Sequence, residues 1–176
     1  MTAIEETTVW LEKAVIGLNL CPFAKAVHSK GQIRWVLSET TEPAVLLELL
    51  VQELQYLAAT DPEVIDTTLI VHPQVMQDFL DFNDFLGVAD EALEEMGLIG
   101  ALQIASFHPQ FQFADTDIDD ITNATNRSPY PTLHLLREAS VERAVAAFPE
   151  ADAIFEGNIE TLRRLGPDGW SMLFKR

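Results

Sequence analysis

Three short runs of apolar and β-branched residues alternate with two long helical patterns in the middle of the chain. The expected strands are 32–37, 66–71 and 101–107, and the expected helices between them are 44–59 and 75–96. This order predicts parallel strands joined by right-handed crossovers, with helices packed against the sheet. A fourth strand is expected at 133–137. Because it follows a long polar loop instead of a helix, we expect it to be antiparallel or at an edge of the sheet.

The alternation predicts an α/β fold. We expect a single-domain sandwich over residues 1–176, with a small mixed, mostly parallel four-stranded sheet covered by helices. A length of 176 residues fits one domain, and a hydrophobic content of 48% is typical of globular chains. Thr2 and Glu5 have the spacing of a capping box, which predicts the start of a first helix. The tail at 170–174 is apolar enough to pack back on the domain.

The charge of the chain limits its partners. A net charge of −17 would repel a nucleic-acid backbone or an anionic membrane, so we expect neither as a partner. A single cysteine cannot form an intramolecular disulfide, which suits a reducing cytoplasm. The acidic N-terminus lacks the basic region of a signal peptide, and no apolar run approaches the ~20 residues that span a bilayer. We therefore expect a cytoplasmic protein, and its oligomeric state stays open.

A stiff loop leads into the fourth strand. Its two prolines, Pro129 and Pro131, fix φ and favour extended geometry in the residues before them. Rigid loops held by a scaffold are where binding groups tend to lie. We therefore expect a substrate-binding role for four residues of this loop, namely Asn126, Arg127, Ser128 and Tyr130.

Arg127 is the first lysine or arginine after Arg34, and many carboxylates lie between them. A guanidinium offers a planar fork of donors that suits carboxylate or phosphate, so Arg127 is a candidate clamp for an anionic ligand. The alternative is an internal ion pair with the acidic loop just upstream, at 115–120. Both alternatives stay open at this stage.

Two histidines are each followed by proline directly after a predicted strand. His72 follows the second strand and His108 follows the third. Because ligands of open α/β sheets bind outside the carboxyl ends of the strands, we expect both histidines to line one cleft with Asn126 and Arg127. His108 precedes a stretch at 109–113 in which aromatic residues alternate with amides, as in the wall of a pocket. The alternative for each histidine is a structural hydrogen bond that caps a loop.

Cys21 is the one thiol of the chain and precedes Pro22, which could begin a short helix. A cysteine that caps a helix N-terminus has a lowered pKa, and a Cys–His pair is a common way to activate a nucleophile. The competing interpretation is a cysteine buried between Leu20 and Phe23, because free cysteines are often buried.

The sequence gives little support for a metal or a cofactor. His72, His108 and His134 lack the close spacing of a zinc motif. The acidic alternation at 115–119 lacks the glycine and the terminal glutamate of an EF-hand loop. Glycine-rich phosphate loops are absent as well. We therefore expect no metal and no cofactor.

Three motif blocks resemble those of a family of small bacterial proteins known only as a domain of unknown function. The blocks are Cys21-Pro22-Phe23, the stretch His108-Pro109-Gln110-Phe111-Gln112-Phe113 and the stretch Asn126-Arg127-Ser128-Pro129-Tyr130-Pro131. The resemblance spans nearly the whole chain. It implies no activity, but it favours one site assembled from the three blocks.

Three functional hypotheses follow. The first is an enzyme that acts on a small anionic metabolite, in which Arg127 orients the anion, His108 is a general acid or base, His72 is a further catalytic candidate and Cys21 is a nucleophile. The second is a non-catalytic module in which Arg127 and aromatic residues bind a ligand or a peptide. The third is a metal-binding protein that uses its histidines. Whether the chain is an enzyme stays open.

Overall fold

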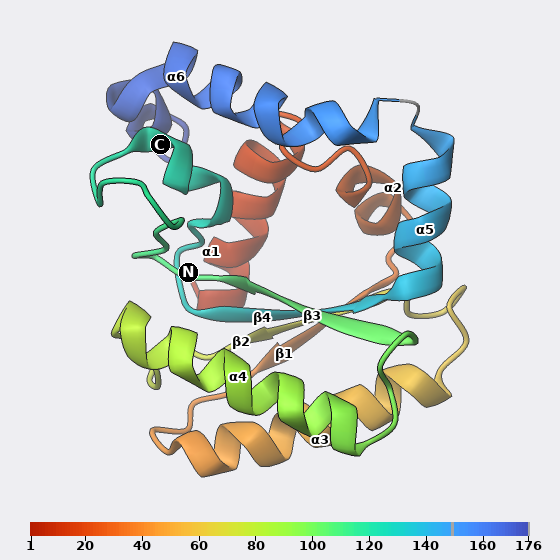
Figure 1. Ribbon diagram of the computed structural model, residues 1–176. Coiled ribbons are helices and arrows are strands. Elements are labelled where there is room, and N and C mark those ends of the chain that lie inside the picture. Colours follow the sequence, from red (N-terminus) through yellow and green to blue (C-terminus); the bar gives the residue numbers. More distant parts are fainter. Residues whose placement is uncertain (149, 176) are drawn as a thin grey trace.

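One open, mixed four-stranded sheet runs through the middle of the molecule, with helices on both of its faces (Figure 1). The computed structural model describes residues 1–148 and 150–175. The strands are β1 (Ile33–Leu37), β2 (Thr67–Val71), β3 (Leu102–Phe107) and β4 (Thr132–Arg137). Their order in the sheet is β1-β2-β4-β3. The predicted α/β class and the mixed four-stranded sheet are confirmed.

The helices form two layers. Helices α3 (Pro43–Ala59) and α4 (Phe79–Glu95) lie on one face of the sheet (Figure 1). On the other face lie α1 (Ala3–Trp10), its π-helical continuation η1 (Leu11–Ile16), α2 (Ala24–Ser29) and α5 (Glu138–Ala147). Helix α6 (Ile154–Met172) lies farther from the sheet, outside this layer (Figure 1). Two short 3-10 segments, η2 (Ile121–Asn126) and η3 (Ala151–Ala153), complete the structure.

Strand β4 is expected to be antiparallel or at an edge of the sheet. It pairs antiparallel with both β2 and β3, whereas β1 and β2 pair in parallel. Strands β1, β2 and β3 therefore run in one direction, but only one of the three pairings is parallel. Of the two expected alternatives for β4, the antiparallel direction is confirmed, and the edge position is not found. The crossover through α4 leaves one strand position vacant between β2 and β3, and β4 fills it on its return.

The capping box at the start of α1 is confirmed. The Thr2 hydroxyl accepts a hydrogen bond from the Glu5 N–H at 3.2 Å, and the Glu5 carboxylate accepts from the Thr2 N–H at 2.7 Å. Helix α4 begins at Phe79, four residues later than the expected start at 75. The Asp78 carboxylate caps it by accepting from the N–H groups of Leu80 and Asp81.

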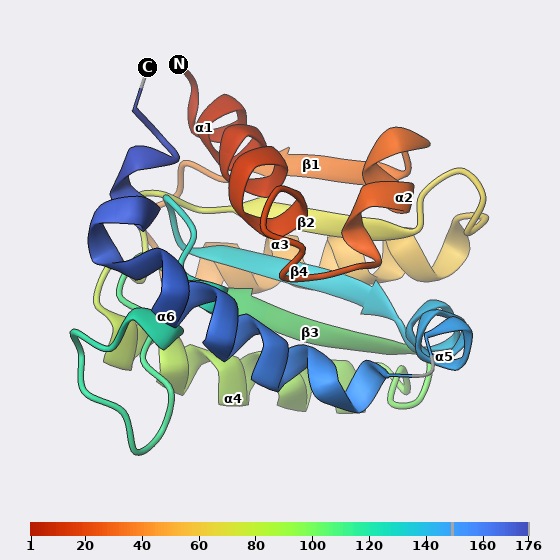
Figure 2. The same cartoon turned by 90° about the horizontal axis from the view of Figure 1, so that it is seen from above.

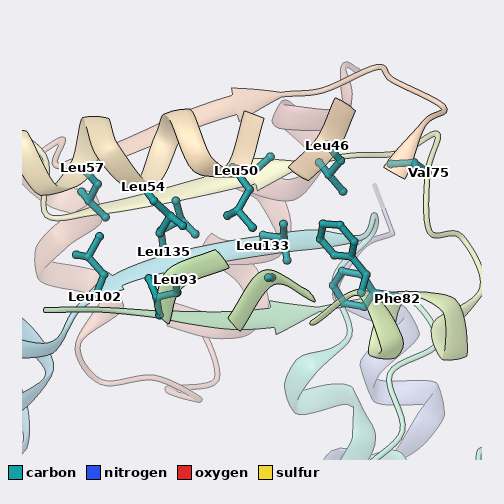
Figure 3. Close-up of a cluster of buried hydrophobic side chains, with 13 residues drawn as sticks. Leu46, Leu50, Leu54, Leu57, Val75, Phe82, Leu93, Leu102, Leu133 and Leu135 are labelled. Carbon is teal, nitrogen blue, oxygen red and sulfur yellow. The ribbon is translucent and has the colours of Figure 1, made fainter. Parts of the chain in front are cut away.

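The main hydrophobic core lies between the sheet and the layer of α3 and α4 (Figure 3). Leu133 and Leu135 of β4 point into it and have no exposed surface. Leucines at helical spacing along α3, at positions 46, 50, 54 and 57, meet them from the other side and are equally buried. Because side chains alternate across a strand, His134 and Leu136 point to the opposite face. Both of these side chains are only half-buried.

Candidate functional site

His72 and His108 lie close together, at the ends of β2 and β3. Both rings pack on Phe82 of α4, with ring centroids 5.5 and 5.2 Å away. They do not line an open cleft, however, because the exposed fractions of His72 and His108 are 0% and 1%. The aromatic rings of α4 cover them, since Phe79 also packs on His108 at 5.4 Å. The expected proximity is found, and the expected exposure is wrong.

The ring nitrogens of these histidines bind the backbone. His108 Nδ1 accepts from the Gln110 N–H at 2.9 Å, so its Nε2–H donates to the Met76 carbonyl, also at 2.9 Å. His72 Nδ1 donates to the Val75 carbonyl at 3.1 Å. The bonds to the carbonyls of Val75 and Met76 hold the segment between β2 and α4, in which Met76 has a φ of +59°. They match the loop-capping alternative for each histidine.

Both imidazoles are neutral near pH 7. Burial lowers the pKa of His72 to about 4, and burial also lowers the pKa of His108. The Nε2 atom of His72 is buried, and no group of the described residues hydrogen-bonds to it. A neutral, hydrogen-bonded ring inside the core stabilises the fold but is poorly placed to exchange protons with a substrate.

Arg127 binds backbone carbonyls of the loop that precedes it. Its Nε donates to the Phe111 carbonyl at 2.9 Å, and Nη2 donates to the Ile118 carbonyl at 2.7 Å. The ion pairs of the described residues join His28 to Glu12 and Arg34 to Glu53, so Arg127 has no carboxylate within 4 Å in this part of the chain. Arg127 thus makes no direct ion pair with the acidic loop, but it binds that loop through the Ile118 carbonyl, and the charges of Asp119 and Asp120 favour its charged form. Burial lowers the pKa of Arg127, which nevertheless stays charged at neutral pH.

The other residues of the stiff loop hold it in place. Asn126 Nδ2 donates to the Ser106 carbonyl at 3.1 Å, which fixes the loop to the end of β3. Ser128 Oγ donates to the Tyr130 carbonyl at 2.6 Å. The Tyr130 hydroxyl donates to the Glu6 carboxylate of α1 at 2.5 Å, and this bond raises the pKa of the phenol. The loop is thus anchored at both ends, and Arg127 and Ser128 lie between the anchors.

A surface hollow of about 540 Å³ lies beside this loop, and we call it the outer hollow. Its lining includes Glu6, Trp10, Arg127, Ser128, Trp170 and Phe174. It combines one cation, one carboxylate and three aromatic rings. Sequence reasoning found Arg127 and Ser128 but missed the residues from α1 and from the C-terminal tail. The apolar character of 170–174 was the one signal in the sequence that this tail would pack on the domain.

The structure places Cys21 elsewhere. Helix α2 begins only at Ala24, after turns, and its N-cap position is Phe23. Cys21 is half-buried against the cluster of apolar residues on α1 and η1. Burial raises the pKa of its thiol, so the expected lowered pKa is wrong. Cys21 and His134 line a second space, of about 320 Å³, between the sheet and the layer of α1, α2 and α5. We call this space the inner cavity.

The described residues also bear on metal binding and on membrane insertion. Within them, no group of three or more His, Cys, Asp or Glu side chains is arranged to hold a metal ion. None of the helices in the same residues is both long enough and apolar enough to cross a membrane.

Comparison with known families assigns the chain. The family described as "Protein of unknown function (DUF1415)" matches residues 2–172. The chain belongs to this family. The match confirms the resemblance to a family of unknown function. No curated protein and no solved structure matches the chain significantly. Because the DUF1415 family brings no activity with it, function has to be inferred from the geometry of the site.

The raised pKa of Cys21 leads to a labelling prediction. We expect iodoacetamide to alkylate Cys21 at pH 7 several times more slowly in the native protein than in urea, because the thiol is half-buried and the thiolate is the nucleophile. Mass spectrometry of timed samples measures both rates. Equally fast labelling in the native protein would restore the hypothesis of an activated thiol.

The lowered pKa of His72 leads to a prediction about acid stability. As the pH falls below ~6.5, His72 of the unfolded chain binds a proton. His72 of the folded protein binds one only when the pH approaches about 4. The neutral imidazole therefore contributes stability that is present above pH 6.5 and is lost between pH 6.5 and 4. The pKa difference corresponds to a few kcal/mol, on the order of 3, in the free energy of unfolding.

His72→Gln tests this contribution, because glutamine can still donate to the Val75 carbonyl and does not titrate. We expect the drop in unfolding free energy between pH 7 and pH 4.5, measured by urea denaturation, to be smaller in the variant by on the order of 2–3 kcal/mol. Carboxylates elsewhere affect both proteins alike. The same pH dependence in both would contradict a neutral buried His72.

Proposed function

We propose that this protein binds a small anionic ligand in the outer hollow and does not transform it. The observation that carries the proposal is the setting of Arg127. It lines a hollow together with three aromatic rings, and two of its five N–H donors bind carbonyls. No carboxylate of the described residues neutralises it within ion-pair distance. Three donors of the fork are thus available to an anion.

The lining indicates the chemistry of the ligand. A guanidinium with donors to spare suits a carboxylate or a phosphate group. The rings of Trp10, Trp170 and Phe174 suit a flat, apolar body. The Glu6 carboxylate repels a second anionic group and favours a donor at the other end of the ligand. A volume of about 540 Å³ lies within the range of small-molecule sites.

The buried histidines favour binding over catalysis. The enzyme hypothesis needs His108 or His72 open to the ligand as a general acid or base. Both rings are covered by α4, and His108 uses both of its ring nitrogens on the backbone. Cys21 lines the inner cavity and not the outer hollow. The candidate nucleophile and the candidate anion clamp therefore belong to two different spaces.

A titration with simple probes tests the proposal. Benzoate carries the expected anion on a flat ring, and benzamide is its neutral isostere. We expect benzoate to shift the NMR signal of the Trp170 indole N–H group and to bind more tightly than benzamide. Arg127→Gln should weaken benzoate binding about tenfold or more, because charge-assisted hydrogen bonds are lost. Arg164→Gln is the matched control, since this arginine is exposed on α6, and it should bind benzoate like the unaltered protein.

Three outcomes would contradict the proposal. Equal affinity for benzoate and benzamide, or equal losses in both arginine variants, would remove Arg127 as the anion clamp. Hydrolysis of phenyl phosphate that is lost in His108→Gln would favour the enzyme hypothesis instead.

A further inference from the structure

The two faces of the sheet are covered to different degrees. On β4, Leu133 and Leu135 are completely buried under α3 and α4, whereas His134 and Leu136 on the other face are half-buried. Ala105 of the neighbouring β3, which pairs with His134, is half-buried too. This face nevertheless lies beneath the layer of α1, α2 and α5 (Figure 1). These helices cover this face of the sheet but leave unfilled space between themselves and the strands.

The inner cavity occupies that space. Seen from above, α1, α2 and α5 lie around the middle of β4 (Figure 2), and residues of η1 and these helices line the cavity. The cavity holds about 320 Å³, and apolar side chains make up most of its lining, among them Leu136, Ala105, Phe107, Val27 and Val141. Protein interiors are normally packed with few voids larger than a water molecule. An apolar space of this size is typical of a ligand site.

His134 is one of the polar residues at the floor of the cavity, with Thr67 of β2 and Gln103 of β3. The hydrogen bonds of histidine rings in the described residues belong to His28, His72 and His108, so His134 makes none there. Its pKa is lowered to about 4 by burial, so its ring is neutral and can donate one hydrogen bond and accept another. Trp10 also lines the cavity, and its buried Nε1–H has no acceptor among the described residues.

We propose that the inner cavity binds a small, uncharged, largely aromatic molecule that carries one hydrogen-bonding group, held by His134. An anionic ligand would lose its hydration without gaining a counter-ion, because the charged residue of the lining is itself a carboxylate, Asp66, which accepts a hydrogen bond from Ser140 at 2.6 Å. This site is separate from the outer hollow, and Trp10 is a wall of both.

N-phenyl-1-naphthylamine is a suitable probe, because it is uncharged and aromatic, carries one N–H donor and gains fluorescence in apolar surroundings. We expect the unaltered protein to bind it with saturation. Ala144→Trp should abolish binding, because Ala144 of α5 lines the cavity. Ala146→Trp makes the same change at an exposed position of the same helix. It should bind the probe unchanged.

His134→Leu tests the role of His134. It should weaken binding of the amine about fivefold, as expected for one lost hydrogen bond. The hydrocarbon 1-benzylnaphthalene has no such donor, so its competition with the probe should change by less than about twofold. Retained hydrocarbon binding also shows that the variant is folded. The proposal is overturned if the unaltered protein binds no probe, if Ala144→Trp binds as well as Ala146→Trp, or if His134→Leu weakens both molecules equally.

Discussion

The antiparallel insertion of β4 between β2 and β3 is the constraint on which the rest of the structure depends. The hydrogen bonds of β4 to both neighbours join the parallel pair β1–β2 to β3 in one sheet. Each side of the strand then has its own role. Leu133 and Leu135 complete the core against α3 and α4, while His134 and Leu136 form the floor of the inner cavity. The loop that leads into β4 carries Arg127 to the outer hollow.

The same insertion explains why the two His-Pro histidines are structural. The backbone N–H of His72 donates to the Pro131 carbonyl, and that of His108 donates to the Asn126 carbonyl, so both residues hold the loop before β4. Their rings meanwhile bind the segment that leads into α4. They therefore connect the loop before β4 to the segment that leads into α4, beside the N-terminal end of β4. Groups with this task need neutral rings in fixed positions, which burial provides.

The local elements of the fold could be predicted from the sequence, and their long-range arrangement could not. The leucine spacing of α3, the β-branched residues of β2 and the capping box at Thr2 act within a few residues. The local sequence pattern therefore predicts these elements. The place of β4 depends on a pairing between segments more than sixty residues apart. No local pattern specifies such a pairing.

The candidate site could be predicted in the same partial way. The stiff loop with Arg127 was found because prolines fix its backbone. The burial of His72 and His108 was missed because it depends on Phe79 and Phe82, which reach them from α4. The contribution of Glu6 and Trp170 was missed because tertiary packing brings the two ends of the chain to this loop.

The central claim is that one face of β4 is packed core and the other is the floor of a ligand cavity. Leu135 and Leu136 are neighbours of identical chemistry on opposite faces, so Leu→Ala at each position tests the claim by urea denaturation. Leu135→Ala should lower the unfolding free energy by about 2–5 kcal/mol, as in a packed core. Leu136→Ala should cost about 1 kcal/mol or less, because its side chain borders space that is already unfilled. Equal losses would contradict the account, since they would mean that both faces are packed alike.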